Sequence, residues 1–264
     1  MIANVISIQG SNRRQVASQR AKNFNYQLVF FDAIDLVKKD VSQFLDVFDT
    51  NGFIDRYSRE PSSGDIGCLL SHYALWKKLS IENKKQYHLI LEDDFIPKVK
   101  SNELLEIINH TKNFDILLLG YSKVQDKEEL VLKIINPIQK IYSTERHNIG
   151  RKFRESTCGA VAYVVSKNFV DEISKSVKKP SHVLDDWSFF KKNGFTILHV
   201  QPLCFHEDFL NMRSSIKESG RFTPIHDATI TKKNLIYRFL RAIFRFAYGR
   251  ILSILMFFGI FSKN

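Results

Sequence analysis

The sequence predicts an α/β protein with a mostly parallel β-sheet covered by helices on both faces, followed by a basic amphipathic helix at the C-terminus. Short apolar runs alternate with helix-compatible segments, which is typical of such a sheet. A chain of 264 residues with 44% hydrophobic side chains can bury a sizeable core. The formal net charge is +11, and residues 232–264 carry seven Lys or Arg with no Asp or Glu. We therefore expect one large domain over residues 1–231 and a separate tail over residues 232–264.

The expected elements follow in chain order. Apolar runs predict strands over 5–8, 27–31, 88–94, 115–120, 160–166 and 195–201. Apolar periodicity and capping residues predict helices over 11–24, 62–80, 103–110, 167–174 and 185–194. Ser166 is positioned to cap the helix that follows it. The segment 122–156 breaks the alternation, because it is charged and contains only VLKII (131–135) as a possible strand. We expect it to be a lid or a substrate-side insertion.

Three carboxylates in a row, Glu92, Asp93 and Asp94, end one of the predicted strands. Like charges this close raise one another's pKa, so the cluster costs free energy unless a cation binds it. Ligands of open α/β sheets bind beyond the carboxyl ends of the strands, and strand alternation places Glu92 and Asp94 on one side. Carboxylate oxygens suit Mg²⁺ or Mn²⁺, which can bridge to the phosphates of a nucleotide diphosphate. A solvated acidic turn is the alternative interpretation.

Several blocks of the chain, in the same order, resemble glycosyltransferase family 25, the lipooligosaccharide-type glycosyltransferases. The resemblance covers roughly residues 1–210 and is most specific in the second and third of these blocks: VFFDAID, GDIGCLLSHYALWKKL, YHLILEDDF, DILLLG, CGAVAYVVSKNF and DDW. An N-terminal block, VISIQGSNRR, precedes these and departs from the family pattern, since IQGSNRR stands where an LDRR-like run is expected.

The resemblance implies a GT-A-like, Rossmann-type fold and the transfer of a hexose, galactose or glucose, from a UDP-sugar to a lipooligosaccharide or lipopolysaccharide acceptor. It implies an inverting, metal-assisted reaction, in which Mn²⁺ or Mg²⁺ stabilises the departing diphosphate. The expected metal ligands are Asp94, Glu92 and the late histidine His206. The expected donor-binding residues are Ser7, Gln9, Arg13, Gly67, Ser71, His72, Glu92, Asp93 and Gly159. For Arg13 a solvated helix face, and for His72 a packing role in the core, are the alternatives.

An inverting transfer requires one general base for the acceptor hydroxyl. Asp185 and Asp186 are the candidates, because they open a short helix whose dipole favours an ionised carboxylate. We prefer Asp186 as the base, and expect the other aspartate to be the helix N-cap.

Two other classes of function compete with this interpretation. A metal-dependent phosphohydrolase also uses clustered carboxylates, but it usually needs a second acidic cluster for a second metal. A nucleic-acid-binding protein would use the basic tail, but the body lacks basic residues interleaved with stacking aromatics, so we expect no nucleic-acid partner.

The C-terminal tail predicts a membrane contact. On a helix, Arg238, Arg241 and Arg245 share one face and apolar side chains cover the other. The apolar run 251–261 is 11 residues long, short of the ~20 needed to span a bilayer. We expect the tail to lie on an anionic membrane surface near a lipid-linked acceptor. Without a secretory signal or a disulfide pattern, a cytoplasmic protein at the inner membrane is expected. Packing of the tail on the body, or oligomerisation through it, is the alternative.

Overall fold

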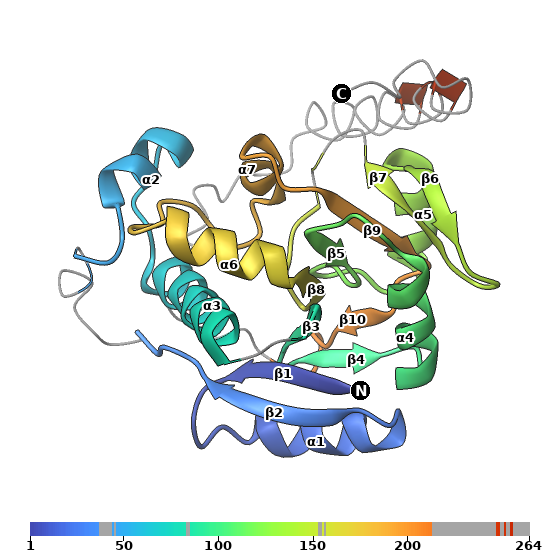
Figure 1. The fold of residues 1–264 in the computed structure, drawn as a ribbon, viewed down its shortest axis with the longest axis horizontal. Coiled ribbons are helices and arrows are strands. Elements are labelled where there is room, and N and C mark those ends of the chain that lie inside the picture. Colours follow the sequence, from blue (N-terminus) through green and yellow to red (C-terminus); the bar gives the residue numbers. More distant parts are fainter. Residues whose placement is uncertain are drawn as a thin grey trace, which may run out of the picture.

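An eight-stranded mixed sheet forms the centre of the molecule (Figure 1). The computed structural model describes residues 1–36, 44, 46–82, 85–152, 155, 157–212, 247–248, 251 and 254–255. The strand order is β2-β1-β3-β8-β5-β9-β7-β6. The strands of this sheet are β1 (Ile2–Ser7), β2 (Gln27–Asp32), β3 (Tyr87–Glu92), β5 (Ile116–Leu118), β6 (Ile138–Ser143), β7 (Asn148–Lys152), β8 (Ala162–Ser166) and β9 (Ile197–Gln201). A separate two-stranded sheet pairs β4 (Phe95–Pro97) with β10 (Phe205–Glu207).

The predicted fold class is confirmed. β1 pairs in parallel with β2 and β3, and β5 pairs in parallel with β9. Only β8 and β7 run against the other strands of the described sheet. The helices of the described chain are α1 (Arg13–Asn23), α2 (Thr50–Tyr57), α3 (Ser63–Glu82), α4 (Ser101–His110), α5 (Asp126–Ile135), α6 (Lys167–Ser176) and α7 (Trp187–Lys192).

The two faces of the sheet bury separate cores. Along β1 the side chains alternate, so that Ile6 packs with α3, α6 and α7 while Val5 packs with α1 and α4. Trp76 on α3 is fully buried at the centre of the first core. Figure 1 shows α3 and α6 together on one side of the sheet and α1 and α4 on the other. Covering both faces leaves the strand ends as the place where a ligand can approach.

Helix α6 begins where the sequence predicts. The Ser166 hydroxyl accepts a hydrogen bond from the Phe169 backbone N–H at 3.0 Å, as an N-cap does. Helix α2 is not predicted by the sequence analysis; Asp49 caps it by accepting from Gly52 N–H at 3.0 Å.

The insertion 122–156 is the main correction to the predicted elements. Its VLKII run lies in α5 and is not a strand, because a capping box between Gln125 and Glu128 starts a helix there. The hairpin of β6 and β7 then extends the sheet beyond β9. The two ends of the insertion meet, since Ser122 N–H donates to the Cys158 carbonyl at 2.9 Å. The hairpin therefore builds the far edge of the sheet, while Ser122 and Lys123 at the start of the insertion line the pocket.

The predicted tail and its amphipathic helix lie almost entirely outside the described residues. Within the part that the structure describes, no helix combines the length and apolarity needed to cross a membrane.

Candidate functional site

A pocket with a volume of about 990 Å³ opens at the carboxyl ends of β1 and β3. Its walls come from the start of α1, the loop 33–36 after β2, the first half of α3, and the segments 158–160 and 183–185. The parallel pairing of β1, β2 and β3 explains this convergence, because their carboxyl ends meet at one edge of the sheet. The EDD carboxylates that the sequence analysis singled out lie within this pocket.

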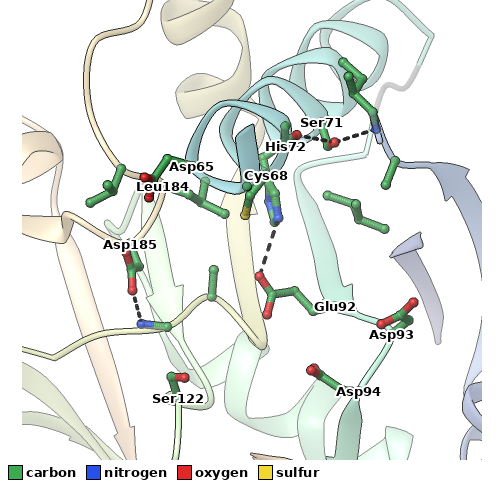
Figure 2. Close-up of a pocket in the computed structure, with 18 of the residues that line it drawn as sticks. Asp65, Cys68, Ser71, His72, Glu92, Asp93, Asp94, Ser122, Leu184 and Asp185 are labelled. Atoms are coloured by element: carbon green, nitrogen blue, oxygen red, sulfur yellow. Dashed lines mark hydrogen bonds and ion pairs between the residues drawn. The ribbon is translucent and has the colours of Figure 1, made fainter. Parts of the chain in front are cut away.

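Four carboxylates face one another across the pocket: Glu92, Asp94, Asp185 and Glu207. Burial, followed by the charges of Asp94, Glu207 and Asp185, raises the pKa of Glu92 well above its usual value. Burial, together with the charges of Glu207 and Asp93, raises the pKa of Asp94 to about 7. Figure 2 shows Glu92, Asp94 and Asp185 around one cavity, with Asp93 to the side. We call Glu92, Asp94, Asp185 and Glu207 the pocket cluster.

The carboxylate of Asp93 is paired with side chains of the protein itself. It accepts hydrogen bonds from the Ser7 hydroxyl at 2.6 Å and from Arg13 Nη1 at 3.0 Å. Arg13 lies 3.8 Å from Asp94 Oδ2, beyond hydrogen-bond range. Ser7 and Arg13, both predicted to contact the donor, therefore line the pocket and at the same time fix Asp93.

The pocket cluster fits a divalent cation. Asp94 Oδ1 is buried and has no hydrogen-bond partner among the described residues. A buried carboxylate oxygen without a donor is costly unless a cation completes it. The side chain of Glu92 remains 31% accessible, so it can reach a ligand in the cavity. Asp94 and Glu92 are thus the residues that would hold Mn²⁺ or Mg²⁺, as hard oxygen ligands.

Asp185 and Asp186 have different environments. Asp186 is the N-cap of α7 and accepts from Phe189 N–H at 3.2 Å. It also accepts from the Tyr57 hydroxyl at 2.7 Å and does not line the pocket. Asp185 lies on the pocket wall, where Gly159 N–H donates to its Oδ2 at 2.7 Å. The geometry therefore favours Asp185 as the base, the reverse of the preference drawn from the sequence.

Gly159 holds the backbone that Asp185 contacts. Its φ of +97° is a conformation that other residues rarely adopt, and a Cβ there would lie 2.3 Å from Ser122 N. Its carbonyl accepts from the Trp187 indole N–H at 3.2 Å. The predicted donor contact at Gly159 thus coincides with a position that only glycine can occupy.

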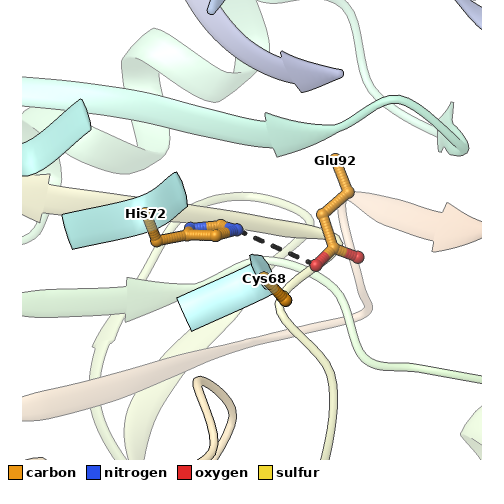
Figure 3. Close-up of side chains that lie close together, drawn as sticks. All are labelled: Cys68, His72 and Glu92. Carbon is orange, nitrogen blue, oxygen red and sulfur yellow. Dashed lines mark ion pairs between the residues drawn. The ribbon is translucent and has the colours of Figure 1, made fainter. Parts of the chain in front are cut away.

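The predicted polar residues of α3 also lie at the pocket. Ser71 donates to the Gly67 carbonyl at 2.6 Å and accepts from Ile34 N–H at 2.8 Å, which ties α3 to the loop after β2. At Gly67 a Cβ would lie 2.7 Å from the Ile34 carbonyl oxygen, so the helix and the loop need glycine to approach. Burial lowers the pKa of His72 to about 3, so its imidazole is neutral. Figure 3 shows His72, Cys68 and Glu92 close together.

Gln9 and His206 do not line the pocket, in contrast to the sequence-based expectation. Gln9 is exposed. His206 lies in β10 and contacts Glu129 at 3.4 Å, because strand alternation sends neighbouring side chains to opposite sides. The neighbouring Glu207 faces the pocket instead and accepts from Lys123 N–H at 2.7 Å. Glu207 was not among the predicted site residues. Strand alternation along HED (206–208) could have placed its side chain on the opposite side from His206.

The sequence profile of glycosyltransferase family 25 (LPS biosynthesis protein) matches residues 1–187. The chain belongs to this family. A "Glycosyltransferase 25 family member" of Aedes aegypti is 28% identical over 48% of this chain and 23% of its own length. The "Lipooligosaccharide biosynthesis protein lic2B" of Haemophilus influenzae is 28% identical over 66% of this chain and 62% of its own length.

A third relative, "Procollagen galactosyltransferase 2" of Mus musculus, is 32% identical over 35% of this chain and 16% of its own length. The chain therefore spans less than two thirds of the length of these three relatives. Among solved structures, the inositol-1-phosphate CTP transferase of T. maritima superposes with a TM-score of 0.36 and 12% identity. That superposition covers 78% of this chain and 88% of the other.

Proposed function

We propose that this protein transfers a hexose, galactose or glucose, from a UDP-sugar to a lipooligosaccharide or lipopolysaccharide acceptor, with inversion and with the help of Mn²⁺ or Mg²⁺. Membership of glycosyltransferase family 25 supports the reaction class. The name of the H. influenzae relative supports the acceptor, and that of the mouse relative supports galactose as the sugar.

One observation carries the proposal: the pocket cluster, with its buried Asp94 oxygen that has no donor among the described residues. Asp94 and Glu92 would hold the cation. Their pKa values are raised by burial first and by the neighbouring carboxylates second, and a bound cation would offset both effects. A bound divalent cation supplies Lewis-acid stabilisation of the diphosphate as it leaves. Arg13, at the same end of the pocket, holds the Asp93 side chain in place through its hydrogen bond.

Asp185 acts on the acceptor side. The acceptor hydroxyl oxygen forms a bond to the anomeric carbon, its proton passes to Asp185, and the bond to UDP breaks with its electron pair on the phosphate oxygen. The Gly159 N–H holds one oxygen of Asp185, which fixes the carboxylate on the wall before the acceptor binds. Asp186 keeps α7 in place through its cap and its bond to Tyr57.

A donor assay tests the proposal. UDP-galactose and UDP-glucose are each incubated with the full-length protein, with Mn²⁺ or with excess EDTA, with and without a lipooligosaccharide acceptor. We expect sugar transfer that needs metal and acceptor, detected by glycan mass spectrometry. Equal turnover in EDTA contradicts the metal role. Cleavage of the UDP-sugar to UMP and sugar 1-phosphate at the same rate with and without acceptor supports the alternative, a metal-dependent phosphohydrolase.

The tail brings the enzyme to its acceptor in this proposal. The sequence of residues 232–264 has the spacing of a basic amphipathic helix, which would suit an anionic membrane surface on the cytoplasmic side of the inner membrane. Truncation after Thr231 is expected to abolish sedimentation with anionic liposomes and to leave metal-dependent turnover of soluble acceptors intact. Undiminished sedimentation of the truncated protein rules this role out.

A further inference from the structure

His72 connects the core of α3 to the pocket cluster. It is buried, its Nδ1 lies 2.5 Å from the Tyr163 hydroxyl oxygen, and its Nε2 lies 3.9 Å from Glu92 Oε1 (Figure 3). Ligand atoms of Cys68, His72 and Glu92 all lie within 4.8 Å of one another, as in a metal site. Whether His72 can bind a metal depends on which ring nitrogen carries the proton, because a ligand needs a lone pair facing the pocket.

The hydrogen-bond directions around Tyr163 determine that proton. The indole of Trp76 is a donor only, and its Nε1–H donates to the Tyr163 oxygen at 3.2 Å. The Tyr163 side chain is fully buried, and among the described residues the one acceptor recorded for its own proton is His72 Nδ1. Tyr163 therefore donates to Nδ1, and the proton of neutral His72 lies on Nε2.

The opposite tautomer is disfavoured by the same contacts. With the proton on Nδ1, both Trp76 and His72 would donate to the Tyr163 oxygen, and the Tyr163 proton would have no acceptor in the described core. A buried donor without a partner costs free energy, so native structures rarely leave one.

We infer that His72 is a positioning residue that presents a fixed, neutral Nε2–H to Glu92, and that it is not a metal ligand. The inference rests on the proposed metal role of Glu92. At 3.9 Å the two groups stand slightly beyond hydrogen-bond range, and the partly accessible Glu92 side chain can close that gap by a small rotation. Holding one carboxylate oxygen of Glu92 leaves the other directed at the cation, as partners of metal ligands commonly do.

His182 provides an internal reference with the opposite tautomer. Its Nδ1 lies 2.8 Å from the Val183 carbonyl, which can only accept, so the proton is on Nδ1. Its Nε2 lies 2.9 Å from the Tyr73 hydroxyl, which donates to it. Without the Tyr73 hydroxyl, the Val183 carbonyl still fixes the tautomer of His182. Without the Tyr163 hydroxyl, nothing recorded at His72 Nδ1 fixes the tautomer of His72.

The test measures imidazole tautomers by ¹H–¹⁵N NMR on the full-length, metal-free protein, with ¹⁵N-labelled histidine. We expect His72 as the Nε2–H form and His182 as the Nδ1–H form. In Tyr163→Phe, His72 is expected to become a mixture of tautomers, while in the matched control Tyr73→Phe His182 stays unchanged. A wild-type His72 with its proton on Nδ1 overturns the inference, whatever the variants do.

A second readout measures Mn²⁺ binding by EPR. We expect the Kd of Tyr163→Phe for Mn²⁺ to rise ~10-fold and that of Tyr73→Phe to stay the same. Loss of a residue that orients a metal ligand typically lowers metal affinity by at least about tenfold. An unchanged Kd in folded Tyr163→Phe contradicts the positioning role, and if that variant does not fold, the wild-type tautomer decides. Failure of the wild-type protein to bind Mn²⁺ counts against the proposed function alone, because the NMR experiment contains no metal.

Discussion

The protein contains two groups of acidic side chains that differ in how they are neutralised. The first is the pocket cluster, and the second, which we call the edge cluster, consists of Asp126, Glu129 and His206 beside the end of the sheet. Lys98 lies 3.1 Å from Asp126, and its hydrogen bond lowers the pKa of that carboxyl. Burial alone would raise the pKa of Glu129, but hydrogen bonds from His206 and the Leu203 backbone, with the charge of Lys133, lower it on balance.

The pocket cluster shows the opposite response. Its carboxylates Glu92 and Asp94 have raised pKa values, although Arg13 is nearby and hydrogen-bonds to Asp93. The edge cluster thus has hydrogen-bond donors and cations that lower the pKa of its carboxylates, whereas Arg13 in the pocket pairs with Asp93 and the pKa values of Glu92 and Asp94 stay raised. The difference supports the proposal that a cation from outside binds the pocket cluster, while the edge cluster is balanced within the protein.

The strongest challenge to this comparison is one matched substitution in each cluster. Asp94→Asn is expected to lower metal-dependent transfer by more than ~100-fold, since losing even an indirect partner of a metal typically costs about 10–100-fold. Asp126→Asn, an exposed member of the edge cluster, is expected to leave transfer unchanged. Initial rates at saturating Mn²⁺ and circular dichroism of both variants provide the measurement. A near-normal Asp94→Asn enzyme would remove the basis for the comparison.

The two neighbouring aspartates of α7 sharpen the assignment within the pocket. Asp185→Asn is expected to lower kcat by about 10²–10⁴-fold, the usual contribution of a general base, with little change in UDP binding. Asp186→Asn is expected to keep near-normal kcat, because asparagine caps a helix about as well as aspartate. Steady-state kinetics with UDP titration distinguish them. The reverse pattern would restore Asp186 as the base.

The pH dependence of metal binding tests the raised pKa of Asp94. With a pKa of about 7 in the folded protein, Asp94 is protonated at lower pH and must lose that proton to bind a cation. We expect Mn²⁺ affinity to rise ~10-fold per pH unit up to about pH 7 and then level off.

The same shift has a consequence for stability without metal. Because the folded pKa of Asp94 exceeds the unfolded value, the contribution of Asp94 to the stability of the metal-free protein falls as pH rises from about 4 to about 7, and comparison with Asp94→Asn isolates this contribution. Thermal unfolding in EDTA and in Mn²⁺ across this range measures both effects. Metal affinity that is independent of pH below 7 would show that Asp94 is ionised throughout.

The smallest expected effect concerns the edge cluster. Glu129→Gln is expected to lower the free energy of unfolding by about 1–3 kcal/mol, because its carboxylate accepts from the buried Leu203 N–H and faces His206. Chemical denaturation measures this loss, and Mn²⁺ should not restore it. Recovery by Mn²⁺ would indicate a second metal site and would make the two clusters alike.

Much of the fold could be predicted from the sequence. The runs of β1, β3, β8 and β9 are short, mostly apolar and bounded by polar residues, and this length favours strands over helices. The 131–135 run could not be assigned correctly by itself, because five apolar and basic residues fit a strand or a helix, and the capping box that decides it lies upstream.

The site was predicted where chemistry and position in the fold agree. Asp94 and Glu92 follow a core strand, and the end of such a strand is where ligands bind. The choice between Asp185 and Asp186 depends on which one Tyr57 and Phe189 engage, and this is a tertiary contact that one sequence does not reveal. Glu207 lines the pocket in place of the predicted His206 for the same reason, since the pairing of β10 with β4 sets which of the two faces the pocket.

The hydrogen bond between Ser122 and Cys158 has a consequence for how such enzymes diversify. This bond, 2.9 Å from the Ser122 nitrogen to the Cys158 oxygen, joins the two ends of the insertion. The length and sequence between these ends can therefore change while the ends stay together. The joined ends are next to Gly159, whose N–H donates to Asp185, and Lys123, whose N–H donates to Glu207. The hairpin at the edge of the sheet can therefore change in length and sequence without moving the backbone N–H groups that bind Asp185 and Glu207.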